Sequence, residues 1–515
     1  MKKIAWMFIS RFLSHPPIND EDIGIQQDNL LQEYSNHHNN SLFFSEHGWN
    51  HTLFQWLCNM KERMQYCIET LWLSDYSSIS HYINTGTLTI EKPLYMGRTS
   101  WTSDGNTGGK DIPITKLSLD TGEVPGMKHI LWHIIPHIWL KPIILGKALV
   151  LSASCDGYQG YISWIIRHYT HLISNSVSFP SSDRLMISDW SEKKQICLQT
   201  IKEQWITLTS CHGVPCWPLE LLDDLIQYDP LCARKTLRDF CYVSIWWWPP
   251  LEYKQRFKKL LESIDLHQSL YAVNNHTATE WFFGSQMRNF TDLEFHWMKP
   301  YIRGNRFGYI DYSTIDSTQP LNVQSLNVIP LGEVKPGIEY LQVTINHRIP
   351  VPYVIKDLVT FNEHGEYLVT GRMGMASNVA NEHIEQKHIL NCLKDLRHNY
   401  QWLSTYFALA GMELTDDHKL IFHRLIEYDK LSDNQIIYNT SDISKHIHHR
   451  FIAHHEQYRN FATKGKIISC QVTLLSTGSL INSLTKLWRR HGQSKIPHIG
   501  NSNYRELIVP IRKLM

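Results

Sequence analysis

The chain has 515 residues, of which 43% are hydrophobic and 19% charged. This length exceeds what a single hydrophobic core normally serves, and the apolar content excludes a disordered chain. The 50 basic and 49 acidic residues leave a net charge of only +1, so any strongly charged surface must come from an uneven distribution along the chain.

Targeting and membrane signals are weak. Residues 1–13 imitate a signal peptide, but Arg11 interrupts the apolar run and no small-residue cleavage site follows, so we predict a first helix there. The most apolar window, residues 129–152, contains three His, two Lys and two Pro, which a bilayer would penalise. We therefore predict no membrane span and a cytoplasmic location. The ten scattered cysteines form no CxxC pair, which favours reduced thiols.

The pattern along the chain predicts a multidomain α+β protein with mostly helical N- and C-terminal parts. Residues 87–96 and 143–152 are predicted strands, and the short runs between 305 and 372 predict antiparallel strands. The predicted regions are a helical segment 1–85, a mixed α/β region 86–185, a Trp-rich helical region 186–304, a β-rich region 305–375 and a basic helical domain 376–515.

Positive charge is concentrated at the end of the chain. Residues 441–515 carry twelve Lys and Arg against three Asp and Glu, a net charge of +9, so residues 1–440 carry −8. Seven histidines lie in the same stretch. A basic segment on an acidic body is typical of proteins that bind a polyanion, most often nucleic acid.

We therefore predict that the C-terminal domain binds RNA or DNA through contacts between cations and phosphates. Trp488 lies beside two of these cations and belongs to the same predicted surface. The predicted binding residues are His446, His448, His449, His455, Arg459, Lys464, Lys466, Lys486, Arg489 and Arg490.

Residues 441–460 are predicted to form a helix with Ser441 as its N-cap and an inward stripe of Ile443, Ile447, Phe451 and Tyr458. Arg450 and His454 would then be one turn apart, an arrangement that metal-independent RNA cleavage can use.

The stretch IHHRFIAHHE is similar to the R-N-x-L-I-A-H helix of HEPN-type ribonucleases, although the Arg of that family falls on His448 here. The resemblance implies a ribonuclease with Arg450 and His454 as catalytic residues, and this is the enzymatic alternative. A protein-interaction scaffold without enzymatic activity is the third hypothesis.

Other arrangements are less specific. His446 and His448 resemble the His–hydrophobic–His triplet of HUH endonucleases, with Tyr458 as nucleophile, but that motif needs a strand. The row His129, His133 and His137 has helical spacing, as has the set Glu382, Glu385 and His388, and both are interpreted as structural or surface residues.

Two further patterns are too unspecific to indicate a function. The segment 97–112 is rich in glycine but does not match a P-loop, because Asp104 and Asp111 occupy its required positions, and we interpret it as a surface loop. Asp316, Glu333 and Lys335 match a loose nuclease pattern that is common by chance. We predict no cofactor and no metal site, and leave open whether the chain is an enzyme.

Overall fold

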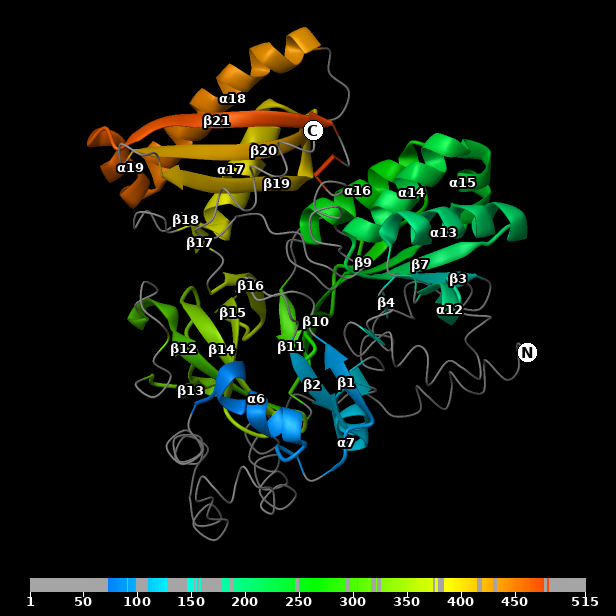
Figure 1. The fold of residues 1–515 in the computed structure, drawn as a ribbon, viewed down its shortest axis with the longest axis vertical. Coiled ribbons are helices and arrows are strands. Elements are labelled where there is room, and N and C mark those ends of the chain that lie inside the picture. The colour runs from blue at the N-terminus through cyan, green and yellow to red at the C-terminus, as the bar shows by residue number, and fades with distance from the viewer. Residues whose placement is uncertain are drawn as a thin grey trace. The chain divides into compact units, whose positions relative to one another are not determined.

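The fold is that of a computed structural model, in which the chain forms two compact units (Figure 1). Unit 1 comprises Met1–Trp101 and Thr107–Thr370, and unit 2 comprises Thr102–Asn106 and Gly371–Met515. The structure describes residues 73–89, 91–98, 110–123, 125–126, 146–151, 153–154, 157–158, 178–185, 187, 189–245, 250–291, 297–302, 304–315, 321, 326–373, 376–377, 384–414, 419–428, 433–476 and 479–480.

Unit 1 contains one sheet of 12 strands in the order β13-β12-β14-β15-β16-β11-β10-β9-β8-β7-β3-β6. The five strands at the β6 end pair in parallel. Numbered by their position in the chain, they have the order 2-1-3-4-5, which is that of a doubly wound fold. Their bounds are β3 (Lys147–Val150), β6 (Ser178–Phe179), β7 (Leu208–Gly213), β8 (Tyr242–Ile245) and β9 (Tyr271–Thr277).

The other part of the sheet is antiparallel in the pairs whose register is described. β9 therefore lies where the parallel and antiparallel parts meet. The strands of this part are β10 (Phe282–Gln286), β11 (Met298–Pro300), β12 (Asn305–Asp311), β13 (Ile329–Pro330), β14 (Glu339–Asn346), β15 (Tyr353–Phe361) and β16 (Tyr367–Arg372). Short 3₁₀ turns follow β12 and β13 at Tyr312–Thr314 (η3) and Leu331–Glu333 (η5).

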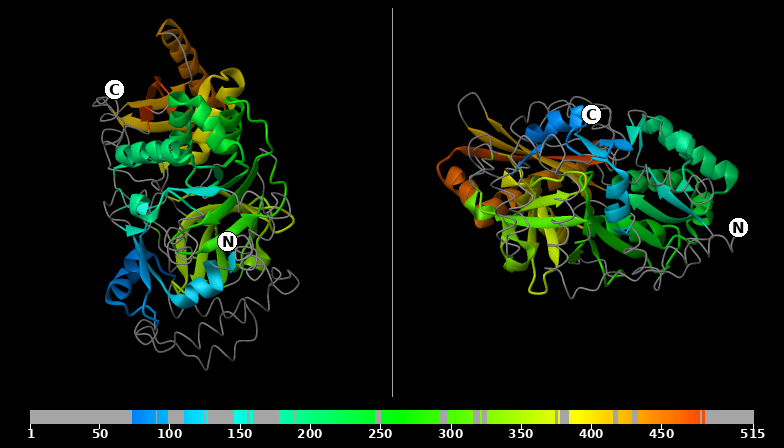
Figure 2. Two further views of the ribbon diagram at one scale, coloured as in Figure 1. Left: turned by 90° about the vertical axis from the view of Figure 1, so that its right-hand side faces the viewer. Right: turned by 90° about the horizontal axis from the view of Figure 1, so that it is seen from below.

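Four helices of unit 1 gather beside the parallel strands, as Figures 1 and 2 show. They are α13 (Trp190–Gln204), α14 (Cys216–Tyr228), α15 (Pro230–Leu237) and α16 (Pro250–Glu262). Asp189 caps α13 by accepting a hydrogen bond from the Glu192 amide, and Asp229 caps α15 through the Cys232 amide. Other helical segments in the described part of this unit are α6 (Tyr76–Thr85), α7 (Lys116–Ser118), the π-helical turn η2 (Leu119–Glu123) and α12 (Ser182–Leu185).

Two small ladders accompany the main sheet. β1 (Tyr95–Arg98) pairs with β2 (Asp111–Ile114) in antiparallel register, and β4 (Ala153–Ser154) pairs with β5 (Gly157–Tyr158). The glycine-rich segment therefore connects the two strands of a hairpin, while residues 99–109 themselves lie outside the described part of the chain.

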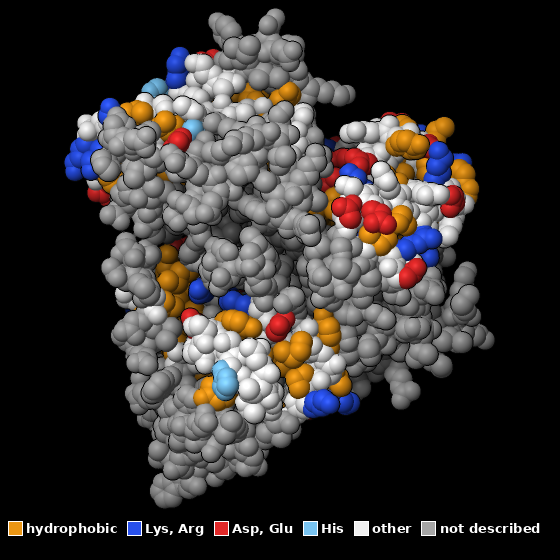
Figure 3. Space-filling model, viewed as in Figure 1, with side chains coloured by type: hydrophobic (Ala, Val, Ile, Leu, Met, Phe, Trp, Pro, Cys, Tyr) orange, Lys and Arg blue, Asp and Glu red, His pale blue; other side chains and the backbone are white. Residues whose placement is uncertain are grey.

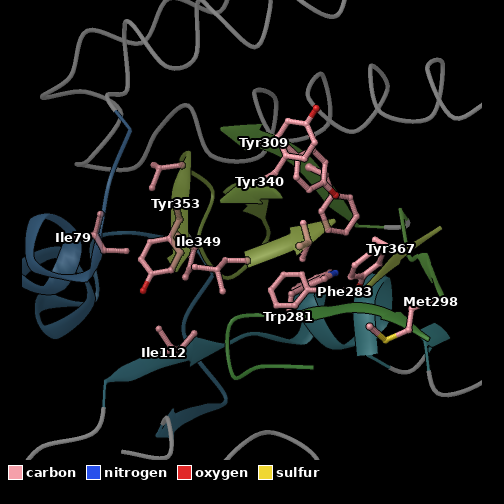
Figure 4. Packing of buried hydrophobic residues seen from close by; sticks show 14 of the residues in the cluster. Ile79, Ile112, Trp281, Phe283, Met298, Tyr309, Tyr340, Ile349, Tyr353 and Tyr367 are labelled. Atoms are coloured by element: carbon pink, nitrogen blue, oxygen red, sulfur yellow. The ribbon is translucent and has the colours of Figure 1, made fainter. Parts of the chain in front are cut away.

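Aromatic side chains fill the core on one face of the antiparallel strands (Figure 4). Tyr309 packs edge-on against Phe361 with ring centroids 5.0 Å apart, and Phe283 lies 6.3 Å from Phe307. Trp281 is completely enclosed. Burying these rings stabilises unit 1, because each large ring removes much apolar surface from water.

Unit 2 is a three-stranded sheet covered by helices. β19 (Leu403–Leu414) and β20 (Leu420–Tyr428) are antiparallel, whereas β21 (Ile467–Ser476) pairs in parallel with β20. A parallel pair needs a crossover, and two helices between β20 and β21 supply it. Among the described residues, unit 2 also contains the helices α17 (Gln386–Asn399), α18 (Asp433–His454) and α19 (Glu456–Thr463) and the minor strands β17 (Ala376–Ser377) and β18 (Ile384–Glu385).

The inward stripe predicted for the histidine-rich helix is confirmed. Ile443, Ile447 and Phe451 are buried on α18, and Tyr458 is buried on α19. The predicted N-cap at Ser441 is wrong, because α18 begins at Asp433. The helix also ends at His454, and its successor starts at Glu456.

The expectation of mostly helical N- and C-terminal parts is wrong, whereas the mixed α+β composition and the antiparallel strands of residues 305–372 are confirmed. Strands such as β7 and β8 are short and buried along nearly their whole length, so their sequences show no alternation that would separate them from helix. Within residues 143–152, β3 forms as predicted but is shorter. The finer division into five regions stays a prediction.

In the described segments, no helix combines the length and the apolarity that crossing a bilayer requires.

We predict that Gly122→Ala lowers the free energy of unfolding by about 1–3 kcal/mol, because the added Cβ would clash with the indole of Trp281. Gly332→Ala is the matched control, since nothing lies within 4 Å of its added Cβ. Denaturant unfolding of both variants measures the difference. Equal stability of the two variants would show that Trp281 is not confined as described.

Candidate functional site

The topology places the candidate site at the carboxyl ends of the parallel strands. β3 has β6 on one side and β7 on the other, so the chain changes direction across the sheet between β3 and β7. In sheets of this kind, ligands bind outside the carboxyl ends of the strands near such a switch point. The residues that end β7, β8 and β9 are therefore the first to consider.

His212 lies at the end of β7, directly opposite Val150 of β3. Its Nε2 is 3.1 Å from the Ser210 hydroxyl oxygen, and its ring packs edge-on against Tyr242 at 5.3 Å. Burial disfavours the charged imidazolium and lowers the pKa of His212 to about 4. The switch point therefore presents a neutral imidazole at physiological pH.

Polar side chains cross-link the strands around β9. The Asn275 side-chain amide donates to the Ser244 hydroxyl of β8 at 2.9 Å, and the Ser285 hydroxyl of β10 donates to Asn275 Oδ1 at 2.7 Å. All three side chains are buried. Because each finds a partner on the neighbouring strand, the sheet tolerates them in its interior.

On the other face of β9, His276 lies between a carboxylate and a phenol. Its Nε2 is 3.0 Å from Asp357 Oδ2, and its Nδ1 is 3.1 Å from the Tyr367 hydroxyl. An ionised carboxylate only accepts hydrogen bonds, so Nε2 donates to Asp357 and Nδ1 accepts from Tyr367. Burial raises the pKa of Tyr367, which keeps its hydroxyl protonated as a donor. A Cβ at Gly284 would clash with that hydroxyl, so the absence of a side chain at Gly284 leaves space for Tyr367 beside His276.

The turn after β9 encloses Glu280. Only 4% of this residue is exposed, and no hydrogen bond or ion pair joins its carboxylate to another residue of the described ranges. Its neighbours are held: the Ala278 amide donates to the Trp281 carbonyl at 2.9 Å, and Arg348 Nη1 donates to the Thr279 carbonyl at 2.6 Å. A carboxylate on a residue this enclosed is stabilised when a cation lies beside it, and a ligand can bring that cation.

The donor set fits a divalent cation that arrives with a ligand. Within the described part of the chain, no group of three His, Cys, Asp or Glu side chains could hold a metal ion by itself. Mg²⁺ usually binds to one or two protein carboxylates and takes its other oxygens from water and phosphates. Glu280 suits that mode of binding.

The predicted catalytic pair lies in unit 2 and does contact. Arg450 Nη1 and His454 Nε2 are within hydrogen-bond distance on α18, and the Arg450 guanidinium also pairs with Asp395 of α17. Arg450 is thus already neutralised by a carboxylate, and it is only half-exposed. The contacts around Arg450 and His454 therefore do not support the catalytic role that we predict for them from the sequence.

Three of the described residues predicted to bind nucleic acid hold the fold of unit 2 together. His448 Nδ1 is 2.9 Å from the Tyr458 hydroxyl, and burial lowers the pKa of His448. His455 caps α19 by accepting from the Tyr458 amide. Arg459 donates to two carbonyls at the end of α18, those of Ile452 at 2.6 Å and Ala453 at 2.7 Å.

The remaining predicted residues are scattered. His446 lies 6.4 Å from the Tyr400 ring, whereas Lys464 and Lys466 are exposed at the end of α19. In Figure 3, Lys and Arg side chains gather at that end of unit 2 beside an acidic side chain. His449 lies near His448, with ring centroids 6.3 Å apart. Lys486, Trp488, Arg489 and Arg490 lie outside the described residues.

The other motifs do not assemble either. His446 and His448 are on a helix, and Tyr458 is buried, so the HUH arrangement is not formed. His388 packs against His455 with ring centroids 4.5 Å apart. Outside the described residues lie His129, His133, His137, Glu382 and Asp316.

Comparison with solved structures shows which fold this is. The chain is similar to the GH3.15 acyl acid amido synthetase, with a TM-score of 0.71 and 11% identity over 96% of this chain and 93% of the other. The structure of the AtGH3.15 acyl acid amido synthetase in complex with 2,4-DB has a TM-score of 0.70 at 10% identity. The match covers 96% of this chain and 94% of the other. For 2-hydroxyisobutyryl-CoA ligase in the postadenylation state with R3-HIB-AMP, the TM-score is 0.55 at 10% identity. This match covers 96% of the present chain and 92% of the ligase.

Neither a protein-family model nor a curated protein matches the sequence. At these identities, the similarity establishes the fold.

These findings overturn the predicted function. A nucleic-acid-binding protein, a HEPN-like ribonuclease and RNA or DNA partners are wrong, because nearly the whole chain has the fold of acyl acid amido synthetases and an acyl-CoA ligase. A stretch of chain with a net positive charge need not form a positive surface, because its cations can be engaged within the fold. The basic stretch includes an arginine that caps a helix and another that pairs with Asp395.

Sequence reasoning missed His276, Glu280, Arg348 and Asp357. One signal was available: the apolar residues 270–273 are followed by the polar run NNHTATE, which is typical of a buried strand with a functional carboxyl end. The prediction of a helical region over these residues concealed it. Nothing local marked Arg348 or Asp357, whose partners lie 69 and 81 residues away.

We predict that the free energy of unfolding decreases as the pH falls from about 6.5 to about 4, partly because of His212. In the unfolded chain His212 binds a proton with a pKa near 6.5, whereas in the folded chain its pKa is about 4. Between these pH values the unfolded chain binds more protons, so acid favours unfolding. His212→Gln should flatten this dependence, as measured by denaturant unfolding at several pH values. The exposed His267→Gln is the matched control. An unchanged pH slope in His212→Gln would contradict the assignment.

Proposed function

We propose that the chain is an adenylate-forming enzyme that activates a carboxylic acid with ATP. The fold supports the proposal, since one protein with a similar fold was captured with an acyl-AMP compound. The observation that carries it is Glu280, an enclosed residue after the carboxyl end of β9 whose carboxylate has no hydrogen bond or ion pair with another described residue. An ATP-dependent reaction also agrees with a cytoplasmic location, which stays part of the proposal.

In the proposed reaction, a carboxylate oxygen of the substrate attacks the α-phosphorus of ATP. The bond from that phosphorus to the oxygen bridging to the β-phosphorus breaks, and pyrophosphate leaves, so that an acyl-adenylate remains. The protein needs no nucleophile of its own for this step. Its task is to orient the two substrates and to stabilise the charge that develops on the phosphates.

The residues of the site can divide this task. Glu280 would hold Mg²⁺, which supplies charge neutralisation at the phosphate oxygens when bound. Asp357 is an acceptor of the kind that binds ribose hydroxyls in other nucleotide sites, and His276 fixes its orientation through the 3.0 Å contact. Tyr367 in turn fixes His276.

For the second step, we propose transfer of the acyl group to an amine, with formation of an amide. The amine nitrogen attacks the acyl carbon, AMP leaves with the electron pair of the broken C–O bond, and the nitrogen loses a proton. The higher similarity to acyl acid amido synthetases supports this acceptor over a thiol, since their TM-scores are 0.70 and 0.71, compared with 0.55 for the CoA ligase.

We expect Mg²⁺-dependent exchange of labelled pyrophosphate into ATP in the presence of a suitable member of a panel of aliphatic and aromatic carboxylic acids. Glu280→Gln should reduce the exchange rate at least about 100-fold, because the charge at the phosphates loses its stabilisation. Glu203→Gln, on the surface of α13, is the matched control. Exchange that survives Glu280→Gln, or its absence with every acid in a folded protein, would refute the proposal.

With the acid found in that assay, amino acids and other amines should yield an amide that mass spectrometry detects, whereas coenzyme A should yield little thioester. Hydroxylamine should trap the acyl-adenylate as a hydroxamate even without another acceptor. A thioester as the main product would leave adenylation intact but assign the second step to a thiol.

A further inference from the structure

We infer that Arg348 is a positioning residue that fixes the turn carrying Glu280 and thereby sets the affinity of the site for a divalent cation. The inference rests on the proposed function, in which Glu280 holds the cation that accompanies ATP. Arg348 is wholly buried in the turn between β14 and β15, far in sequence from the residues that it contacts.

The Arg348 side chain connects three segments of unit 1. Its Nη1 donates to the Thr279 carbonyl at 2.6 Å, directly before Glu280, and its Nε lies 3.4 Å from the Ser118 hydroxyl at the end of α7. The guanidinium carbon is 5.6 Å from the ring centroid of Trp281, directly after Glu280. Arg348 therefore touches the residue on each side of Glu280.

The base of Arg348 is itself rigid. Asn346 Oδ1 accepts hydrogen bonds from the amides of Arg348 at 3.0 Å and of Ile349 at 3.1 Å, and the Asn346 amide donates to the Ile349 carbonyl at 3.0 Å. The guanidinium is thus held in place by a closed turn as well as by its own contacts.

Trp281 is confined on its other sides by backbone. A Cβ at Gly122 would clash with the indole, and a Cβ at Gly304 would lie 2.8 Å from its Cζ2 and 3.0 Å from the Thr121 carbonyl oxygen. Gly304 also has a φ of +66°, which disfavours other residues. With Thr279 and Trp281 both held, the backbone of Glu280 has little freedom, so its carboxylate is preorganised.

Only arginine has the shape for this position. A guanidinium donates through a planar fork and stacks on an aromatic ring, whereas an ammonium is a point charge on a flexible chain. Arg348→Lys keeps the positive charge but removes the fork. The substitution therefore separates positioning of the turn from a simple electrostatic effect of the charge.

The test measures binding of Mn²⁺ by electron paramagnetic resonance in the presence of α,β-methylene-ATP, which cannot be cleaved at the reacting bond. We expect Arg348→Lys to weaken Mn²⁺ binding about tenfold, as loss of a residue that orients a metal ligand commonly does. In the exchange assay, the Mg²⁺ concentration for half-maximal rate should rise similarly, while the KM for the carboxylic acid stays nearly unchanged.

Arg424→Lys is the matched control. Arg424 is equally buried, donates to the Ile389 carbonyl at 3.4 Å and lies 5.7 Å from the Phe422 ring centroid, but it belongs to unit 2. It should affect stability without changing Mn²⁺ binding. Ser118→Ala removes the longer contact of Arg348 together with the hydrogen bonds between Ser118 and Thr115 that cap α7. It should weaken binding less than Arg348→Lys, which keeps the inference testable should the lysine variant not fold, and Thr115→Ala controls for the loss of the cap.

Two results would overturn the inference. One is Mn²⁺ binding that Glu280→Gln abolishes but Arg348→Lys and Ser118→Ala leave unchanged. The other is an equal weakening by Arg424→Lys, which would indicate a general loss of stability. If the wild-type protein binds Mn²⁺ with the nucleotide analogue but shows no exchange with any acid, the proposed function fails while the positioning role of Arg348 stands.

Discussion

The contact between Arg348 and Trp281 is the constraint on which the described part of the site depends. A buried guanidinium needs acceptors in fixed directions, and the Thr279 carbonyl is one of them. A buried indole needs a flat slot, and Gly122 and Gly304 leave one. Because both requirements are met around one short turn, the residues on either side of Glu280 are held in place. Packing and hydrogen bonds around the turn therefore fix the position of the Glu280 backbone.

The sheet explains why this turn lies where it does. β9 is the last parallel strand and the first partner of the antiparallel part, so its carboxyl end is followed directly by a hairpin turn into β10. The residues of this turn, Thr279 to Trp281, are buried. The same strand carries polar side chains on both of its faces, and they are tolerated because neighbouring strands supply partners for Asn275 and His276.

In unit 2, charge that seems available in the sequence is engaged in the structure. Arg459 satisfies carbonyls at the end of α18, where a cation also interacts favourably with the helix dipole. His455 occupies the break between α18 and α19 as a cap. Cations and histidines in such positions contribute to helix termination, which a count of net charge cannot distinguish from a binding surface.

Features that depend on local periodicity could be predicted from the sequence: the antiparallel strands of residues 305–372 and the inward stripe of Ile443, Ile447 and Phe451. Each follows from one buried face with a fixed repeat. Only the tertiary structure decided that β7, β8 and β9 are parallel strands, since strands buried on both faces have no repeat. It alone also joined Arg348 to Ser118, 230 residues away, because such a contact depends on how distant segments pack.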